Sequence, residues 1–295
     1  MLAYAAVRRA QTEARLVRIR EALDRVAERR EIRARASVDP VSFVHLYRDP
    51  LDRELVGLIA ASLAFGNVKA FRPKIEDALT RLGPHPSKTG HDRDAVRRSL
   101  RGWKHRVYKD NDLAGLVVGG CLVQQSHGSL GAALQSFLAE HDDDMRLAAS
   151  AFARALRKAG GLDRSKTHGA KHILVDPAAG SAAKRLMLFF RWMIRPADGV
   201  DLGLWDVSPE KLLIPVDVHV HRLGRNLGFT KRTAADWEAA REITDVLRRF
   251  DPHDPVKYDF PLCHLGMLQH CPSRRDEARC EGCGVKPVCL HWAKG

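Results

Sequence analysis

The apolar residues of this chain recur at helical spacing almost throughout. Residues 52–65, DRELVGLIAASLAF, form an apolar segment whose acidic first turn suits the positive end of a helix dipole. Further helices are predicted at 112–125, 129–139, 144–158, 182–195, 218–227 and 237–250. No stretch alternates apolar and polar residues for long, as a half-buried strand would. We therefore expect an all-α protein.

Proline and glycine mark the breaks between these helices. Gly66 and Asn67 end the first apolar helix, and Pro73 is expected in the first turn of the next, where its missing N–H costs little. Residues 159–181 are rich in glycine and predict a loop, with a tight turn at Asp176-Pro177.

Residues 1–37 contain ten arginines and five acidic residues, and their apolar positions from Leu16 to Ile32 follow one helical face. This pattern indicates one basic amphipathic helix. Two interpretations stay open: a solvated helix with salt bridges on its surface, or a basic arm that lies along a phosphate backbone.

The whole chain is strongly basic, with 49 Lys and Arg against 36 Asp and Glu and a formal net charge of +13. Such an excess indicates a nucleic-acid partner. The alternative is a high-GC genome, which encodes Arg in place of Lys on ordinary surfaces. With 45% apolar residues the chain is neither disordered nor collagen-like. No apolar run approaches the roughly 20 residues that span a bilayer, and the N-terminus lacks the order of a secretory signal. We expect a soluble, cytoplasmic protein without a membrane partner.

Four of the six cysteines fall close together near the C-terminus, with the spacing C-x8-C-x2-C-x5-C: Cys271, Cys280, Cys283 and Cys289. In a reducing compartment such a group indicates metal ligands rather than disulfides. Structural zinc usually takes two short ligand pairs, and only one pair is present here. A [4Fe–4S] cluster accepts one thiolate per iron from a single loop, so we favour the cluster, with Zn²⁺ or unligated cysteines as alternatives. Cys121 and Cys263 lie in apolar helical contexts, which predicts buried, inert thiols.

The cysteine loop resembles the terminal loop of the endonuclease III and MutY branch of the helix-hairpin-helix DNA glycosylases, where the first gap is usually six residues rather than eight. Residues 215–222, PVDVHVHR, are similar to that family's V-D-x-H-x-x-R segment. The resemblance implies that Asp217 is the catalytic aspartate, with His219 and Arg222 behind it as DNA-binding residues.

A carboxylate at this position has a clear chemical use. When a glycosidic bond breaks, positive charge develops on C1′ of the sugar, and a fixed anion stabilises it. The alternative is that Asp217 only caps a helix that starts at Val218. Both roles are compatible, because a cap fixes the carboxylate in place.

Residues 174–185, LVDPAAGSAAKR, are similar to the family's phosphate-binding hairpin only in the turn residues and the small residues that start the next helix. Aligning Gly180 with the second glycine of the hairpin sets Lys184 at the position of the family's nucleophilic lysine. The resemblance then implies a Schiff base at C1′ and β-elimination of the 3′ phosphate. The alternative is a solvated or phosphate-facing lysine.

Other residues fit DNA binding less specifically. Asn67 is a candidate to fill the hole left by a flipped nucleotide, and Lys69 to bind phosphate, although a plain turn after a buried helix explains both. Aromatic residues of one predicted helix are candidates for a base pocket, with core packing as the alternative: Phe189, Phe190 and Trp192. Basic residues of the cysteine loop are expected against the DNA backbone: Arg274, Arg275, Arg279 and Lys286.

The resemblance covers roughly residues 40–292 and implies a base-excision repair glycosylase with AP lyase activity, acting on double-stranded DNA that carries a damaged base or an abasic site. It implies two helical lobes with the active-site cleft between them. The expected domains are the basic helix 1–37, a helical barrel 38–213 and a cluster lobe 214–295. We expect a monomer associated with the nucleoid. The rival interpretation is a non-catalytic iron–sulfur protein that binds DNA through the same fold.

Overall fold

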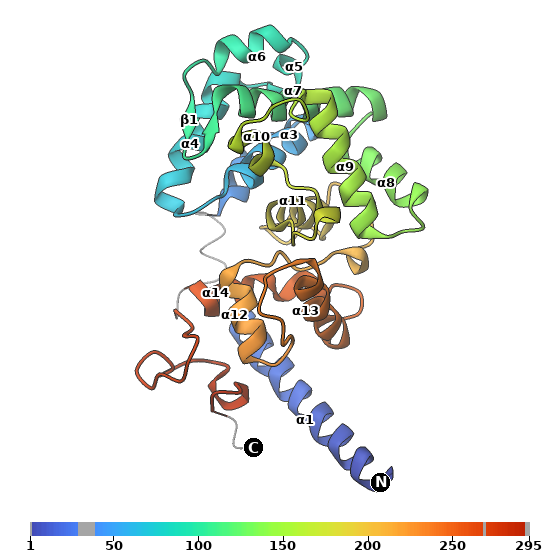
Figure 1. The fold of residues 1–295 in the computed structure, drawn as a ribbon, viewed down its shortest axis with the longest axis vertical. Helices are drawn as coiled ribbons and strands as arrows, with labels where there is room; N and C mark the ends of the chain where they lie inside the picture. The colour runs from blue at the N-terminus through green and yellow to red at the C-terminus, as the bar shows by residue number, and fades with distance from the viewer. Residues whose placement is uncertain (1, 29–38, 268–269, 293–295) are drawn as a thin grey trace. The chain divides into compact units, whose positions relative to one another are not determined.

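A computed structural model gives the fold for residues 2–28, 39–267 and 270–292, with the backbone alone described at 2–12 and 264. The structure is mostly helical, as the hydrophobic pattern predicts (Figure 1). Its α-helices are α1 (Leu2–Ala27), α3 (Pro50–Leu63), α4 (Val68–Leu82), α5 (Pro86–Thr89), α6 (Arg93–Ser99), α7 (Asp110–His127), α8 (Leu130–Glu140), α9 (Met145–Gly160), α10 (His168–Ile173), α11 (Lys184–Ile194), α12 (Val218–Asn226), α13 (Trp237–Phe250) and α14 (Asp259–Met267). The 3₁₀ helices are η2 (Pro40–Leu46), η3 (Pro177–Ala179), η4 (Pro209–Lys211), η5 (Pro255–Tyr258) and η6 (Lys286–Val288). Strands β1 (Lys104–His105) and β2 (Tyr108–Lys109) form an antiparallel hairpin.

The chain divides into two compact units. One consists of residues 36–212, and the other combines residues 1–35 with residues 213–295. Within the ranges that the structure describes, no helix has both the length and the apolar character needed to cross a bilayer.

In the unit formed by residues 36–212, α7 and α9 pack at very short range. A Cβ atom added at Gly160 would lie 1.9 Å from the carbonyl oxygen of Gly115, and one added at Gly119 would lie 2.3 Å from that of Leu156. Backbone therefore lies against backbone at these positions, and only glycine allows the approach.

A buried carboxylate organises the same unit. Glu54 of α3 is 3% exposed and accepts hydrogen bonds from the Gln124 side chain (2.9 Å) and the indole N–H of Trp205 (2.7 Å). It also accepts from the backbone N–H groups of Leu130 (2.7 Å) and Gly131 (3.0 Å), the first residues of α8. One side chain thus joins α3, α7, the start of α8 and the segment after α11.

In the other unit, the described part of α1 packs with the C-terminal residues. Ile19, Leu23 and Val26 are buried, and the Arg15 guanidinium donates to the carbonyl oxygens of Leu227 (3.0 Å) and Val288 (2.9 Å). These contacts tie α1 to the end of α12 and to the cysteine loop.

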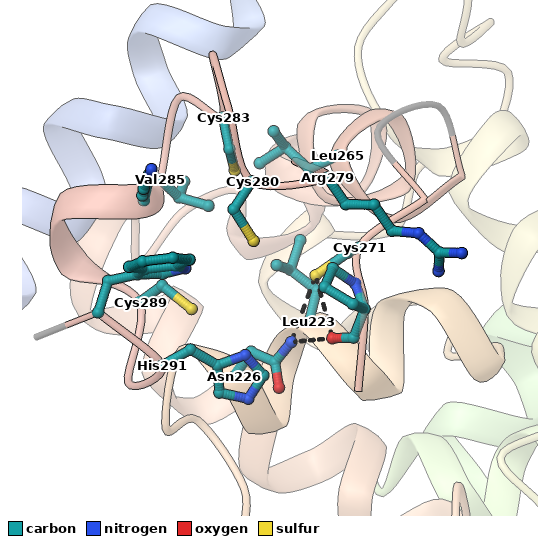
Figure 2. A pocket seen from close by; sticks show the side chains of 13 residues that line it. Leu223, Asn226, Leu265, Cys271, Arg279, Cys280, Cys283, Val285, Cys289 and His291 are labelled. Carbon is teal, nitrogen blue, oxygen red and sulfur yellow. Dashed lines mark hydrogen bonds between the residues drawn. The ribbon is translucent and has the colours of Figure 1, made fainter. Parts of the chain in front are cut away.

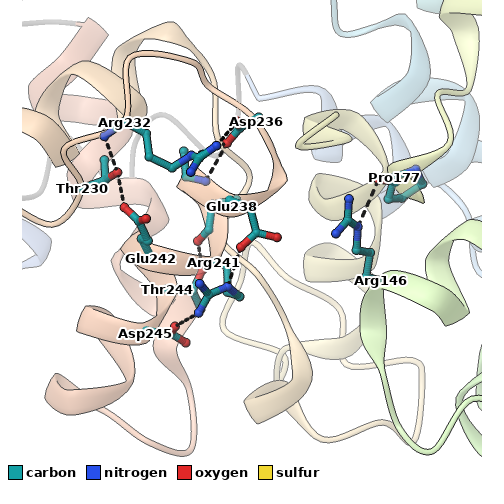
Figure 3. A network of polar contacts seen from close by, with 12 residues as sticks. Arg146, Pro177, Thr230, Arg232, Asp236, Glu238, Arg241, Glu242, Thr244 and Asp245 are labelled. Atoms are coloured by element: carbon teal, nitrogen blue, oxygen red, sulfur yellow. Dashed lines mark hydrogen bonds and ion pairs between the residues drawn. The ribbon is translucent and has the colours of Figure 1, made fainter. Parts of the chain in front are cut away.

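The exposed face of α13 is covered by ion pairs, seen in Figure 3, in which Arg241 bridges Glu238 (2.9 Å) and Asp245 (2.9 Å). Because these pairs are solvent-exposed, each contributes little stability. The predicted bounds of this helix, 237–250, are confirmed.

Several sequence-based expectations need correction. α4 begins at Val68 rather than near Pro73, because Asn67 caps it earlier, and Pro73 lies in its interior. Residues 159–181 are not all loop, because Thr167 caps the short helix α10 within them. Cys263 is half-exposed rather than buried. Residues 29–37 of the predicted N-terminal helix, Ile32 included, lie outside the described residues.

Candidate functional site

Asp217 is fixed at the start of α12. Its Oδ1 accepts hydrogen bonds from the backbone N–H groups of His219 (2.9 Å) and Val220 (2.9 Å), which makes it the N-cap of the helix. The carboxylate is half-buried, whereas the next residue, Val218, is 62% exposed. The capping role is confirmed, and the catalytic role stays a prediction.

α12 also holds the start of the cysteine loop. The Arg222 guanidinium donates to the carbonyl oxygen of Cys271 (2.9 Å). One turn later, the Asn226 side chain donates to Cys271 Sγ (3.3 Å) and to the carbonyl oxygen of Pro272 (3.0 Å). A single short helix therefore connects the Asp217 carboxylate to the first cysteine.

His219 lies on the face of α12 that meets α14. A Cβ atom added at Gly266 of α14 would lie 2.9 Å from Cβ of His219, so the two helices are in close contact there. The His219 Nδ1 atom is buried and has no hydrogen-bond partner among the described residues. His219 and Arg222, which are expected to bind DNA, thus already make contacts within this unit.

The four clustered cysteines line one cavity, and Figure 2 shows their side chains arranged around it. Cys280 and Cys289 are buried, Cys271 and Cys283 are half-buried, and none of them forms a disulfide. Among the described residues, no three or more His, Cys, Asp or Glu side chains are grouped closely enough to hold a metal ion as they stand. Four thiols nonetheless line the cavity together with the His291 imidazole. Thiols suit soft metals and iron–sulfur clusters, and an imidazole suits Zn²⁺.

The cavity around these thiols is lined by apolar residues, Leu223, Leu265, Pro272 and Val285, and by side chains that carry N–H groups: Asn226, Arg279, Lys286, His291 and Trp292. Burial raises the pKa of the Cys271 thiol, partly offset by the hydrogen bond from Asn226, and burial also raises the pKa of the Cys289 thiol. Bare thiolates are therefore disfavoured there, and a bound metal would supply the positive charge that deprotonates them. The indole N–H of Trp292 lines the same cavity, and it is buried without a partner in the described chain.

The basic residues expected to face DNA lie on the loop around this cavity: Arg274, Arg275, Arg279 and Lys286. Arg274 is exposed. Arg275 and Lys286 lie over the ring of Trp292, at 4.1 Å and 4.3 Å from its centroid. Arg279 pairs with Asp276 at 3.5 Å. Three of the four cations are thus oriented by contacts within the loop.

Lys184 is the first residue of α11 and is half-buried. The residue before it, Ala183, has a left-handed backbone (φ 43°), and no side chain caps the helix. Positive φ is costly for alanine, and strained residues of this kind cluster at functional sites. The strained residue turns the chain so that α11 begins at the lysine.

The turn that precedes α11 is well anchored. Gly180 has φ 92°, which explains the glycine, and a Cβ atom there would meet nothing within 4 Å. From α9, the Ser150 hydroxyl donates to Asp176 (2.5 Å), and Arg146 donates to the carbonyl oxygen of Pro177 (3.4 Å; Figure 3). The turn at Asp176-Pro177 is confirmed as η3, and its outer edge of small residues is open.

The remaining candidates are placed as follows. Asn67 and Lys69 are both exposed, and the Asn67 side chain accepts from the backbone N–H of Lys69 (2.8 Å) as the cap of α4. Phe189, Phe190 and Trp192 are fully buried, and Phe189 lines a cavity beside Lys184. For Phe190 and Trp192 the packing alternative accounts for what the structure shows.

Asn226 was not singled out by sequence reasoning, although it follows Arg222 by four residues and therefore shares its helix face. Arg185, Tyr108 and His172 were also missed. They form a polar cluster beside Lys184 and come from three separate segments of the chain. No local sequence pattern predicts such a cluster.

Comparison with known proteins identifies a family but no activity. Residues 39–268 match the family described as a protein of unknown function, DUF2400, and because this match covers well over half of the chain, the chain belongs to that family. No curated protein and no solved structure matches it. The matched range includes Lys184 and Asp217 and ends before Cys271.

Proposed function

We propose that this member of the DUF2400 family is a DNA base-excision glycosylase that flips a damaged base out of duplex DNA, cleaves its N-glycosidic bond, and nicks the resulting abasic site as a lyase. One observation carries the proposal. The half-buried Asp217 carboxylate, held by two backbone N–H groups, stands on the same short helix that binds the first cysteine through Arg222 and Asn226.

The significance of that helix lies in what it joins. The segment PVDVHVHR and the four-cysteine loop are the two parts of the sequence that resemble helix-hairpin-helix glycosylases, and they lie apart in the chain. An anion stabilises a developing cation only if its position is fixed. Contacts between the two segments would fix Asp217 relative to a structural cluster, as this role requires.

In this proposal Asp217 acts on the sugar. As the bond between C1′ and the base nitrogen breaks, its electron pair leaves with the base, and the carboxylate stabilises the positive charge shared by C1′ and the ring oxygen. Both cap hydrogen bonds are accepted by Oδ1. The negative charge that acts on the sugar is shared by both oxygens of the carboxylate.

Lys184 acts as the nucleophile. After the base has left, its unprotonated amine adds to the cationic C1′. An amine proton passes to the ring oxygen as the bond between C1′ and that oxygen breaks, which leaves a protonated Schiff base. Removal of a C2′ proton then forms a C2′–C3′ double bond, and the 3′ phosphate leaves with the electron pair of its C3′–O bond. What supports this role is the start of α11, where the strained Ala183 sets the lysine at an uncapped helix N-terminus. Such a terminus favours a nearby phosphate.

A [4Fe–4S] cluster would be held by Cys271, Cys280, Cys283 and Cys289, and it would serve as a structural crosslink of the loop. Arg222 and Asn226 hold Cys271 against α12 through their hydrogen bonds. The basic residues of the loop contact the DNA backbone. Zn²⁺ is the alternative occupant.

The test uses end-labelled duplexes, each with one lesion or one abasic site, incubated with the purified protein and scored for breaks with and without alkali. Wild type should break at least one lesion duplex without alkali. Asp217→Asn should abolish breaks while duplex affinity persists, and Lys184→Gln should leave only alkali-dependent breaks.

Undiminished cutting by Lys184→Gln would remove the lyase assignment. If wild type binds every duplex and breaks none, the proposal fails in favour of a non-catalytic DNA-binding protein.

A further inference from the structure

A cavity of about 270 Å³ lies beside Lys184 in the unit formed by residues 36–212. Its walls come from α3, α10, the following turn and the start of α11. Apolar and polar side chains contribute almost equally to the accessible wall. The apolar residues are Leu58, Ile173, Leu174, Val175, Ala183, Leu186 and Phe189, and the polar ones are Ser62, His172, Ser181, Lys184 and Arg185. A concave site with apolar surface and several convergent polar groups is typical of small-molecule sites.

A chain of hydrogen bonds behind the wall fixes the orientation of His172. Arg185 donates to the carbonyl oxygen of Ser62 (3.0 Å), to the carbonyl oxygen of His172 and to the Tyr108 hydroxyl oxygen. That hydroxyl also lies 2.7 Å from His172 Nδ1. Because arginine only donates, the hydroxyl hydrogen stays available for a bond to Nδ1.

When the hydroxyl donates this hydrogen, Nδ1 is the acceptor and the ring proton resides on Nε2, for which the described residues provide no partner. Burial raises the pKa of Tyr108, which keeps its hydroxyl protonated. Burial, Arg185 and His168 lower the pKa of His172 to about 4, which keeps the ring neutral at physiological pH. An uncharged imidazole ring therefore forms part of the cavity wall.

We propose that this cavity receives a nucleobase, with His172 Nε2–H donating to a ring nitrogen or carbonyl oxygen on the base edge. This inference rests on the proposed function, in which Lys184 at the cavity wall acts on the sugar of the same nucleotide. It makes His172 the specificity-determining residue, with Tyr108 and Arg185 as its positioning residues.

Size and wall chemistry favour a base over larger ligands. The volume is below the roughly 300–1,000 Å³ of sites for drug-sized ligands, so a single small ring fits better than a whole nucleotide. The apolar part of the wall, which includes Leu58, Leu186 and Phe189, suits the flat faces of a base.

The same observations disfavour a phosphate at His172. The guanidinium of Arg185 is already engaged by three oxygen acceptors, and His172 carries no charge to offer. At this cavity, Lys184 and the N-terminus of α11 are the groups that favour a phosphate.

The experiment follows the His172 ring nitrogens by NMR in the full-length protein labelled with ¹⁵N-histidine. Adenine, hypoxanthine, uracil and thymine are added one at a time as free bases, and inorganic phosphate is the comparison. We expect at least one base to shift the His172 signals in a saturable way, with Nε2 affected most, and phosphate to leave them in place.

His168 provides a matched control, because it lies on the same helix, stacks on His172 at 5.8 Å and is exposed rather than part of the cavity wall. In saturation-transfer spectra His172→Ala should lose the base signal and His168→Ala should keep it. The inference is overturned if no base moves His172, if phosphate moves it equally, or if both variants lose binding alike.

Excision of bases from damaged DNA is measured on the same preparation. Excision without any response of His172 to bases would refute the cavity assignment alone. A saturable response without excision would support the cavity and refute the proposed function.

Discussion

Substituting Asp217 separates its structural role from its chemical role. Asp217→Ala removes both cap hydrogen bonds, to His219 N and Val220 N, and should cost about 1 kcal/mol of unfolding free energy, within the usual range of roughly 0.5–2 kcal/mol for an N-cap. Asp217→Asn keeps an acceptor oxygen and loses only the charge at the helix N-terminus, which is worth about 0.3–1 kcal/mol. Stability should therefore distinguish the two variants.

Catalysis should not distinguish them. Both variants lack the carboxylate, so base release should fall by roughly 10²–10⁴-fold in each, the range for a positioned acid or base group. The assay pairs urea unfolding, followed by circular dichroism, with single-turnover base release on a duplex that wild type cleaves.

Asp144 is the matched control. It caps α9 with the same pattern, accepting from the backbone N–H groups two and three residues later, Arg146 (2.7 Å) and Leu147 (3.1 Å). Asp144→Ala should lose comparable stability and keep its activity. If Asp217→Asn releases base within about tenfold of wild type, the carboxylate is only a cap and the catalytic reasoning is refuted.

Three further predictions concern the cluster, the histidine and the buried glutamate. Protein purified without oxygen should contain iron and acid-labile sulfide. The Cys280→Ala variant should lose both, and Cys121→Ala should keep them, because Cys121 lies outside the cysteine cavity. Zinc in place of iron would contradict the cluster. His172 has a lower pKa in the folded state, about 4, because of burial and the neighbouring guanidinium, so unfolding free energy should fall as pH drops from about 6.5 to 4. His172→Gln should flatten that dependence, and an unchanged slope would refute the assignment. Glu54→Gln should cost about 2–4 kcal/mol, because one amide oxygen cannot accept from four donors, while the exposed Glu140→Gln should cost little; near-equal losses in urea unfolding would contradict this account.

The sequence predicted those parts of the fold that local patterns determine. The helix at 237–250 combines a clear apolar face with an N-cap at Asp236, and its bounds are confirmed. Where two local signals competed, the prediction was less accurate. Pro73 suggested a later start for α4, but the Asn67 cap begins the helix at Val68 and the proline is tolerated inside it.

Long-range side-chain contacts could not be predicted in the same way. Tyr108 and His172 are 64 residues apart, and Arg185 is 77 residues from Tyr108. Each looks like an ordinary surface or core residue until folding brings them together. The cap role of Asp217 was predictable, because it depends only on the next three residues, whereas the link from Asn226 to Cys271 depends on tertiary structure.

The central claim is that this protein releases damaged bases from DNA, and it can be tested without assuming which lesion is recognised. Genomic DNA is oxidised, alkylated or deaminated in separate batches and incubated with wild type or Asp217→Asn, and the bases freed into the filtrate are identified by mass spectrometry. We predict at least one modified base in the wild-type filtrate that is absent from the Asp217→Asn filtrate. Wild-type protein that binds the DNA but frees no base above the blank would contradict the account.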